Sequence, residues 1–223
     1  MPETPTIPCA TTPRRAARVA WGRADGYRRG VILRKAALRP IPRHAVVDAH
    51  TIHALESSLD EEDETLQDAL DRGFSDLDRR QPAMAGWLAD QLARTRDELV
   101  QSLGYFLTVT VYMAFREAFP TRLHEVDEDA LRMANDMLAV DEELRAADPT
   151  EVLDSDDVIA MSQPALVHYV QHHVDEALDQ ADGEIDLDEL DRVYRAILVQ
   201  VIALSHSVAS PTGELGPSRE MLA

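Results

Sequence analysis

Apolar residues recur with the spacing of an amphipathic helix through most of the chain between residues 46 and 208. Leu131, Ala134 and Leu138, for example, fall on one side of a helix that turns by about 100° per residue. The pattern predicts an all-α protein, a bundle of about six or seven helices. The predicted helices cover residues 46–59 and 61–72, a segment that begins at 82, a segment from 95 to 119, residues 127–147, a short piece at 157–161, and residues 164–180 and 187–208.

Local signals place several ends of these helices. Gly73 predicts the end of the second helix, because glycine readily adopts the backbone conformation that terminates one. Pro82 is favoured in a first turn and marks a start. Thr95 and Glu98 have the spacing of a capping box, in which a hydroxyl and a carboxylate satisfy each other's free backbone N–H groups. The box is predicted to open an uncharged helix that Pro120 stops.

An internal repeat is the most informative pattern in the chain. The sequence of residues 81–88, which begins Gln-Pro-Ala, returns in altered form at residues 163–170. An acidic amphipathic helix precedes each copy and an uncharged helix follows each, a context that favours duplication over coincidence. We therefore expect the bundle to consist of two duplicated three-helix units, at about 60–119 and 127–208.

Charge divides the chain into very different parts. Residues 1–43 hold ten basic and two acidic residues and so carry a net +8, whereas residues 44–223 carry −27, which together give the −19 of the whole chain. We divide the chain into a basic N-terminal arm (1–43), an acidic helical domain (44–210) and a C-terminal tail (211–223). Such asymmetry is typical of an interaction tail. The arm residues predicted to contact a partner are Arg14, Arg15, Arg18, Arg28, Arg29 and Lys35.

The basic arm has two candidate partners. Its own acidic body is the nearest oppositely charged surface, and the short connection keeps the two at a high effective concentration. The alternative is an anionic partner. Arginine binds phosphate with a forked geometry, and Trp21 and Tyr27 could stack on bases, so weak nucleic-acid binding is expected at most. A helix from residue 14 to 38 and a hairpin that turns at 24–26 both fit the arm.

Motifs of several enzyme classes are missing from the sequence. Lys35 is the only lysine and no Gly-Lys pair occurs, which excludes a phosphate-binding loop of the Walker A type. The dinucleotide-binding and hydrolase glycine motifs are also missing. Cys9, the single cysteine, lies in a proline-rich stretch with no base beside it and is a poor nucleophile. The sequence therefore favours a non-catalytic interaction or regulatory protein without a resident cofactor.

A metal-binding helical protein or metal-dependent enzyme is the alternative. Imidazole and carboxylate groups spaced by three or four residues share one helical face and suit zinc, iron or nickel. The best candidate site is centred on His168 and His172 and is completed by Asp175 or Glu176. A second group with similar spacing consists of His50, His53 and Glu56.

Two segments, Leu99–Phe115 and Ile197–Leu204, are free of charged residues. The first is 17 residues long, at the short limit for crossing a bilayer, and a buried core helix explains it better. No apolar signal segment follows the early arginines, so we expect no membrane span and a cytoplasmic location. Because both segments are apolar nearly all round, they must be covered on all sides. A homodimer would complete that burial.

Overall fold

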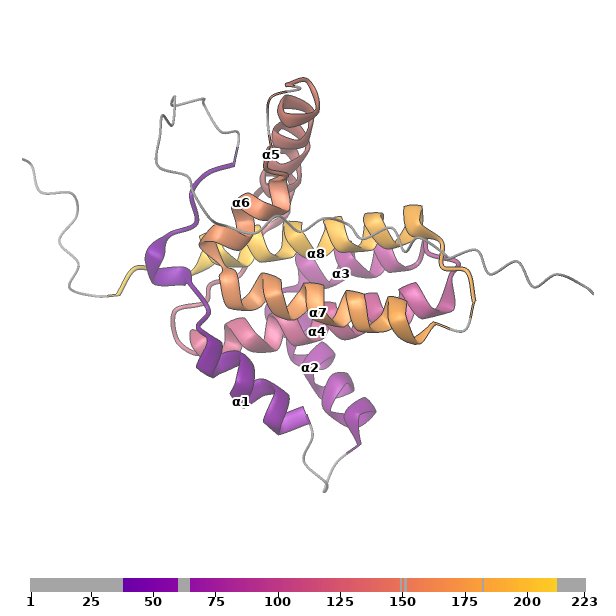
Figure 1. The fold of residues 1–223 in the computed structure, drawn as a ribbon. Helices are drawn as coiled ribbons and strands as arrows, with labels where there is room; N and C mark the ends of the chain where they lie inside the picture. Colours follow the sequence, from indigo (N-terminus) through magenta and orange to yellow (C-terminus); the bar gives the residue numbers. More distant parts are fainter. Residues whose placement is uncertain (1–37, 60–64, 149, 151, 182, 212–223) are drawn as a thin grey trace, which may run out of the picture. The chain divides into compact units, whose positions relative to one another are not determined.

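The computed structural model describes residues 38–59, 65–148, 150, 152–181 and 183–211, and it confirms the all-α prediction (Figure 1). The described residues contain an isolated β-bridge, Leu123 to Val208, but no sheet. They form eight α-helices rather than six or seven, because the short piece predicted at 157–161 is a complete helix of eight residues. After a 3-10 turn, Arg43–Ala45, the helices are α1 (Ala49–Leu59), α2 (Leu66–Arg80), α3 (Pro82–Leu92), α4 (Glu98–Ala118), α5 (Glu128–Ala146), α6 (Ser155–Ser162), α7 (Pro164–Gln180) and α8 (Leu187–Ser207).

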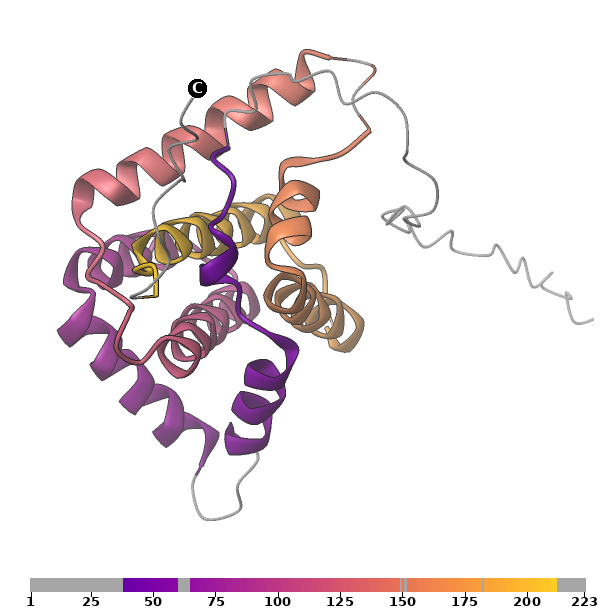
Figure 2. The ribbon, with the colours of Figure 1, turned by 90° about the vertical axis from the view of Figure 1, so that its left-hand side faces the viewer.

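The two longest helices, α4 and α8, form a parallel pair at the centre of the bundle (Figure 2). At their starts, an Asp97 carboxylate oxygen accepts a hydrogen bond from the Asp186 backbone N–H at 3.2 Å. Beyond their ends, the His124 N–H donates to the Ser207 carbonyl at 3.1 Å. The pair is thus held together at both ends, by a side-chain-to-backbone hydrogen bond at the start and a backbone hydrogen bond at the finish.

The remaining helices cover this pair. In α8 every residue from Ala196 to Ser205 is buried, and in α4 the run from Leu107 to Tyr112 is buried. Burial of these apolar helices therefore does not require a second copy, and the homodimer stays a prediction. Among the described residues no helix is both long and apolar enough to cross a bilayer.

A buried glutamine, Gln163, joins α6 to α7 and ties them to a distant segment. Its side-chain carbonyl accepts a hydrogen bond from the Val47 N–H at 2.9 Å. Its amide nitrogen donates to the Ala45 carbonyl at 2.7 Å and to the Ser205 hydroxyl at 2.9 Å. The side chain therefore pairs with the extended segment before α1 in the way that a neighbouring strand would.

Gln81 occupies the matching junction between α2 and α3. Its carbonyl accepts from the Val126 N–H at 2.7 Å and its amide nitrogen donates to the His124 carbonyl at 2.9 Å, in the segment before α5. The backbone angles also match, with φ −136° and ψ 54° at Gln81 and φ −129° and ψ 59° at Gln163. Each glutamine thus holds the segment that leads into the other half of the chain. Residues 127–208 contain four helices, so the prediction of three in that half is wrong.

Gly73 does not end a helix, contrary to the sequence prediction, and α2 continues to Arg80. A Cβ atom on Gly73 would lie 2.6 Å from Val109 Cγ1 and 2.8 Å from Met113 Sδ. Glycine is therefore needed because α2 and α4 approach closely at this point. The terminating signal was misread because a close helix contact requires the same residue as a helix end.

The predicted capping box at Thr95 and Glu98 is also wrong. Helix α4 begins with Asp97, whose carboxylate accepts from the backbone N–H groups of Leu99 and Val100. Thr95 is buried and its hydroxyl has no hydrogen-bond partner in the described residues. Aspartate is as good an N-cap as threonine, so local sequence alone could not choose between the two residues.

Candidate functional site

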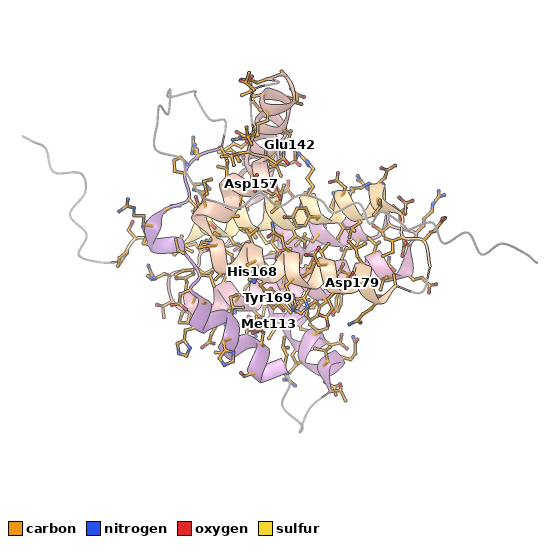
Figure 3. All side chains as sticks on the ribbon, in the orientation of Figure 1. Met113, Glu142, Asp157, His168, Tyr169 and Asp179 are labelled. Carbon is orange, nitrogen blue, oxygen red and sulfur yellow. The ribbon has the colours of Figure 1, made fainter. Side chains whose placement is uncertain are left out.

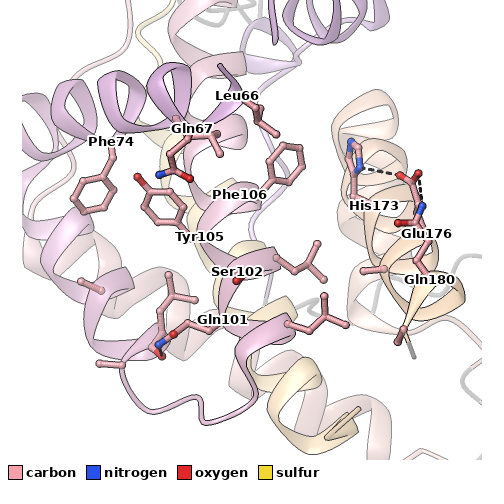
Figure 4. A pocket seen from close by; sticks show the side chains of 18 residues that line it. Leu66, Gln67, Phe74, Gln101, Ser102, Tyr105, Phe106, His173, Glu176 and Gln180 are labelled. Atoms are coloured by element: carbon pink, nitrogen blue, oxygen red, sulfur yellow. Dashed lines mark hydrogen bonds and ion pairs between the residues drawn. The ribbon is translucent and has the colours of Figure 1, made fainter. Parts of the chain in front are cut away.

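A large open groove, with a volume of about 1120 Å³, lies between α2, α3, α4 and α7 (Figure 4). Its lining is mainly apolar, and Glu176 is the only charged residue among those that line it. Tyr105 is fixed by its hydroxyl, which donates to an Asp71 carboxylate oxygen at 3.1 Å. The larger apolar and aromatic side chains of the lining are Leu66, Leu70, Phe74, Leu92, Leu99, Leu103, Tyr105 and Phe106.

His173 lies on the α7 side of the groove and faces Phe106 of α4 (Figure 4). The imidazole makes edge-to-face contacts with the rings of Phe106 and Tyr169, at centroid distances of 4.9 and 4.5 Å. Its Nδ1 lies 3.5 Å from a Glu176 carboxylate oxygen. Burial lowers the pKa of His173 and the neighbouring His172 adds to this, whereas Glu176 favours the charged form.

Two polar atoms beside the groove are buried without a hydrogen-bond partner in the described part of the chain. They are His173 Nε2 and the Tyr169 hydroxyl. Burial raises the pKa of Tyr169 to about 12, so the phenol stays protonated. A neutral imidazole and a neutral phenol inside an aromatic cluster favour apolar contact over acid–base chemistry.

Acidification is expected to destabilise the fold through His173. Its folded-state pKa lies below the unfolded value of about 6.5, so its neutral form contributes stability that is lost as the pH falls through the folded-state value. His173→Phe keeps a ring against Phe106 but cannot titrate. Urea unfolding at about pH 7.5 and about pH 5.5 should therefore show a smaller loss of stability in this variant than in the wild type.

The matched control for this experiment is His53→Phe, because the His53 side chain is 80% exposed. This variant should lose as much stability on acidification as the wild type. Part of the loss common to all three proteins comes from His206, whose pKa is also lowered by burial. An equal loss in the His173→Phe and His53→Phe variants would contradict the prediction.

The candidate metal ligands are exposed on α7, which carries His168 (Figure 3). His168, His172 and Asp175 do not line the groove, whereas Glu176 does. Among the described residues, no three of these ligand groups gather closely enough to hold an ion. The metal site stays a prediction. Stoichiometric metal in the purified chain that is lost on His172→Ala would support it.

The sequence interpretation overlooked His173, the most buried histidine of this helix. A signal for it was present, because His173 follows the buried Tyr169 by four residues and so shares its helical face. In the second predicted group, His53 Nδ1 lies 3.9 Å from a Glu56 oxygen at an exposed site on α1. Neither predicted histidine cluster is therefore enclosed by other elements.

Asp154, Asp156 and Asp157 are the acidic residues that the structure does bring together, with oxygens within 4.8 Å of one another. Asp154 and Asp157 form a capping box at the start of α6, and Tyr194 donates to Asp156 at 3.3 Å. Burial raises the pKa of Asp156, and the nearby Asp157 raises it further. These contacts explain the group as a helix start.

A second, smaller hollow of about 450 Å³ lies where α4 and α8 begin. Three arginines and three acidic residues line it, so its formal charge is zero. Glu189 closes one side, because its carboxylate accepts from the backbone N–H groups of Arg96 and Asp97. The balanced charge gives this hollow no clear preference for an anion or a cation.

The partner-binding residues predicted in the arm lie outside the described residues. These are Arg14, Arg15, Arg18, Arg28, Arg29 and Lys35.

The groove is therefore the feature of the described chain whose form points most directly to binding. It combines an apolar lining, three aromatic rings and a single carboxylate. Comparison of the chain with protein-family models, with curated proteins and with solved structures finds no significant match, so any function must be inferred from the residues themselves.

Proposed function

We propose that this is a non-catalytic helical interaction protein with a regulatory role, whose basic arm contacts its own acidic body. The observation that carries the proposal is the charge of the described surface. Most described arginines of the body already have partners within the chain, for example Arg80 with Asp76, Arg132 with Asp129 and Arg195 with Glu142. The arm, with its net charge of +8, then offers positive charge within the same chain for the surplus acidic side chains.

Limited digestion of the full chain with trypsin tests this contact, because trypsin cleaves after basic residues and the arm holds ten of them. At low salt, contact with the body should slow cleavage of the arm by about tenfold relative to a synthetic peptide of residues 1–43, given tethering at millimolar effective concentration. Protection should decline at about 0.5 M salt, where charges are screened within a few ångströms. Equal cleavage of chain and peptide at both salt concentrations would overturn the proposal.

An anionic partner would compete with the body for the arm. In that case short DNA or RNA should bind the peptide of residues 1–43 more tightly than it binds the full chain, and both affinities should fall with salt. A homodimer is also part of the proposal, and light scattering at tens of micromolar decides between about 25 and about 50 kDa.

We also propose that the two halves of the bundle arose by duplication. Support comes from the matching hydrogen bonds of Gln81 and Gln163 and from the equal length of α4 and α8, 21 residues each. Equivalent halves imply equivalent roles for the two glutamines. Alanine at either position should therefore destabilise the whole bundle.

A further inference from the structure

We propose that the groove between α2, α3, α4 and α7 is where residues 14–27 of the chain's own arm bind. This assignment rests on the proposed arm–body contact and names its location. The groove offers an apolar lining with three aromatic rings and one carboxylate, Glu176. Residues 14–27 carry Trp21 and Tyr27 together with small apolar residues and four arginines. The aromatic and small apolar side chains suit the apolar lining, and the arginines suit the carboxylate.

The charge around the groove favours a basic occupant. Six exposed acidic residues are direct sequence neighbours of residues that line the groove, against a single arginine, Arg94. They lie on the helices that form the groove, and Asp71 accepts a hydrogen bond from Tyr105 of its lining. A basic segment in the groove would therefore lie close to helices with a surplus of negative charge. We call these six residues the acidic rim: Asp68, Asp71, Asp90, Glu98, Asp175 and Asp179.

The arm is long enough to reach the groove. His44, the seventh described residue, lies near the end of α8, because its Nε2 is 3.1 Å from the Val208 carbonyl oxygen. The groove lies toward the start of α4, at Leu99–Phe106, and the 21 residues of that helix extend over about 31 Å. Ten residues span up to about 33 Å when extended, so a linker as long as residues 28–37 can cover a distance of this order and leave residues 14–27 for the groove.

The other end of the chain is a poorer occupant. Residues 212–223 contain Glu214, Glu220 and a single basic residue, Arg219, so this segment has no net positive charge to offer the acidic rim. The arm of a second copy has the right chemistry, but a tethered arm binds its own body at a higher effective concentration at micromolar protein.

Paramagnetic relaxation in the full chain tests the assignment, because Cys9 is the only cysteine and lies just before the segment. With a nitroxide on Cys9, the amide signals of Ser102, Tyr105 and Ala177 should lose more than half of their intensity at low salt and recover at high salt. Broadening around Asp156 with these signals unchanged would overturn the groove assignment and leave the arm–body contact standing. No broadening anywhere would overturn both.

A pair of matched variants gives a second readout. Ala89 lines the groove and is exposed on α3, and Ala130 is exposed on α5 away from the groove. Ala89→Arg should reduce the expected tenfold trypsin protection of the arm to less than about threefold and abolish the broadening. Ala130→Arg adds the same charge but should change neither the trypsin protection of the arm nor the broadening of the groove signals. Equal effects of the two substitutions would overturn the assignment, since they would show only a response to net charge.

A mixed sample separates binding within one chain from exchange between two. Nitroxide-labelled chains without ¹⁵N are combined with ¹⁵N-labelled chains that lack the nitroxide. The expected result is no broadening of the groove signals in the mixture. Broadening as strong as in the doubly labelled chain would overturn the assignment, because the groove would then hold the arm of a second copy.

Discussion

Replacing Gln163 with alanine is expected to lower the free energy of unfolding by about 3–5 kcal/mol. The side chain is fully buried and bonds to Val47, Ala45 and Ser205. Its loss leaves a backbone N–H and a backbone carbonyl without partners in a dry interior, at about 1–3 kcal/mol each, and adds a cavity. Urea or guanidinium unfolding, followed by circular dichroism, measures the change.

Two further variants identify the origin of that loss. Gln163→Leu fills the space but cannot form the hydrogen bonds, so it should still cost about 2–4 kcal/mol. Gln180→Ala removes an exposed amide at the end of α7 and should change stability by no more than about 0.5 kcal/mol. A cost below about 1 kcal/mol for Gln163→Leu would show that the hydrogen bonds do not stabilise this junction.

Placing a large side chain at Gly73 is expected to cost at least about 3 kcal/mol. The first added atom of Gly73→Leu would already lie 2.6 Å from Val109 and 2.8 Å from Met113. Either α2 or α4 must then move, because the branched side chain of Val109 has few alternative rotamers. Gly104→Leu should be similarly harmful, since a Cβ there would lie 2.7 Å from Val193 Cγ1.

The third helical glycine supplies the opposite result. Gly86 has no neighbouring atom within 4 Å of an added Cβ and is exposed on α3. Gly86→Ala should therefore stabilise the fold by about 0.5–1 kcal/mol, the difference in helix propensity. Thermal unfolding of the three variants tests the contrast, and a loss of stability in Gly86→Ala would contradict it.

The candidate site could be predicted only in part. The spacing of His168 and His172 correctly indicated one helical face, but it could not say that this face is exposed. His173 faces the groove because α4 places Phe106 opposite it, and Phe106 lies 67 residues earlier in the chain. Contacts over such distances depend on how the helices pack, which no local pattern encodes.

The helices themselves follow from the sequence alone, because the signals for a helix act within one or two turns. Apolar residues at intervals of three and four, proline in a first turn and aspartate before it are enough to predict α3, α5 and α7 within a few residues. The repeated Gln-Pro-Ala also marked the two junctions correctly. For the capping and first-turn signals, the stabilising partner is a near neighbour in the chain.

Tertiary structure decided the roles of Gly73 and Gln163, which the local sequence signals did not reveal. Gly73 allows a close helix contact instead of ending a helix, and Gln163 binds a segment more than 100 residues away instead of merely preceding a proline. The groove exists only because α7 packs on α4 and leaves the space toward α2 and α3 unfilled. A residue's own preferences are local, whereas close approach, buried hydrogen bonding and open space depend on which elements the packing brings together.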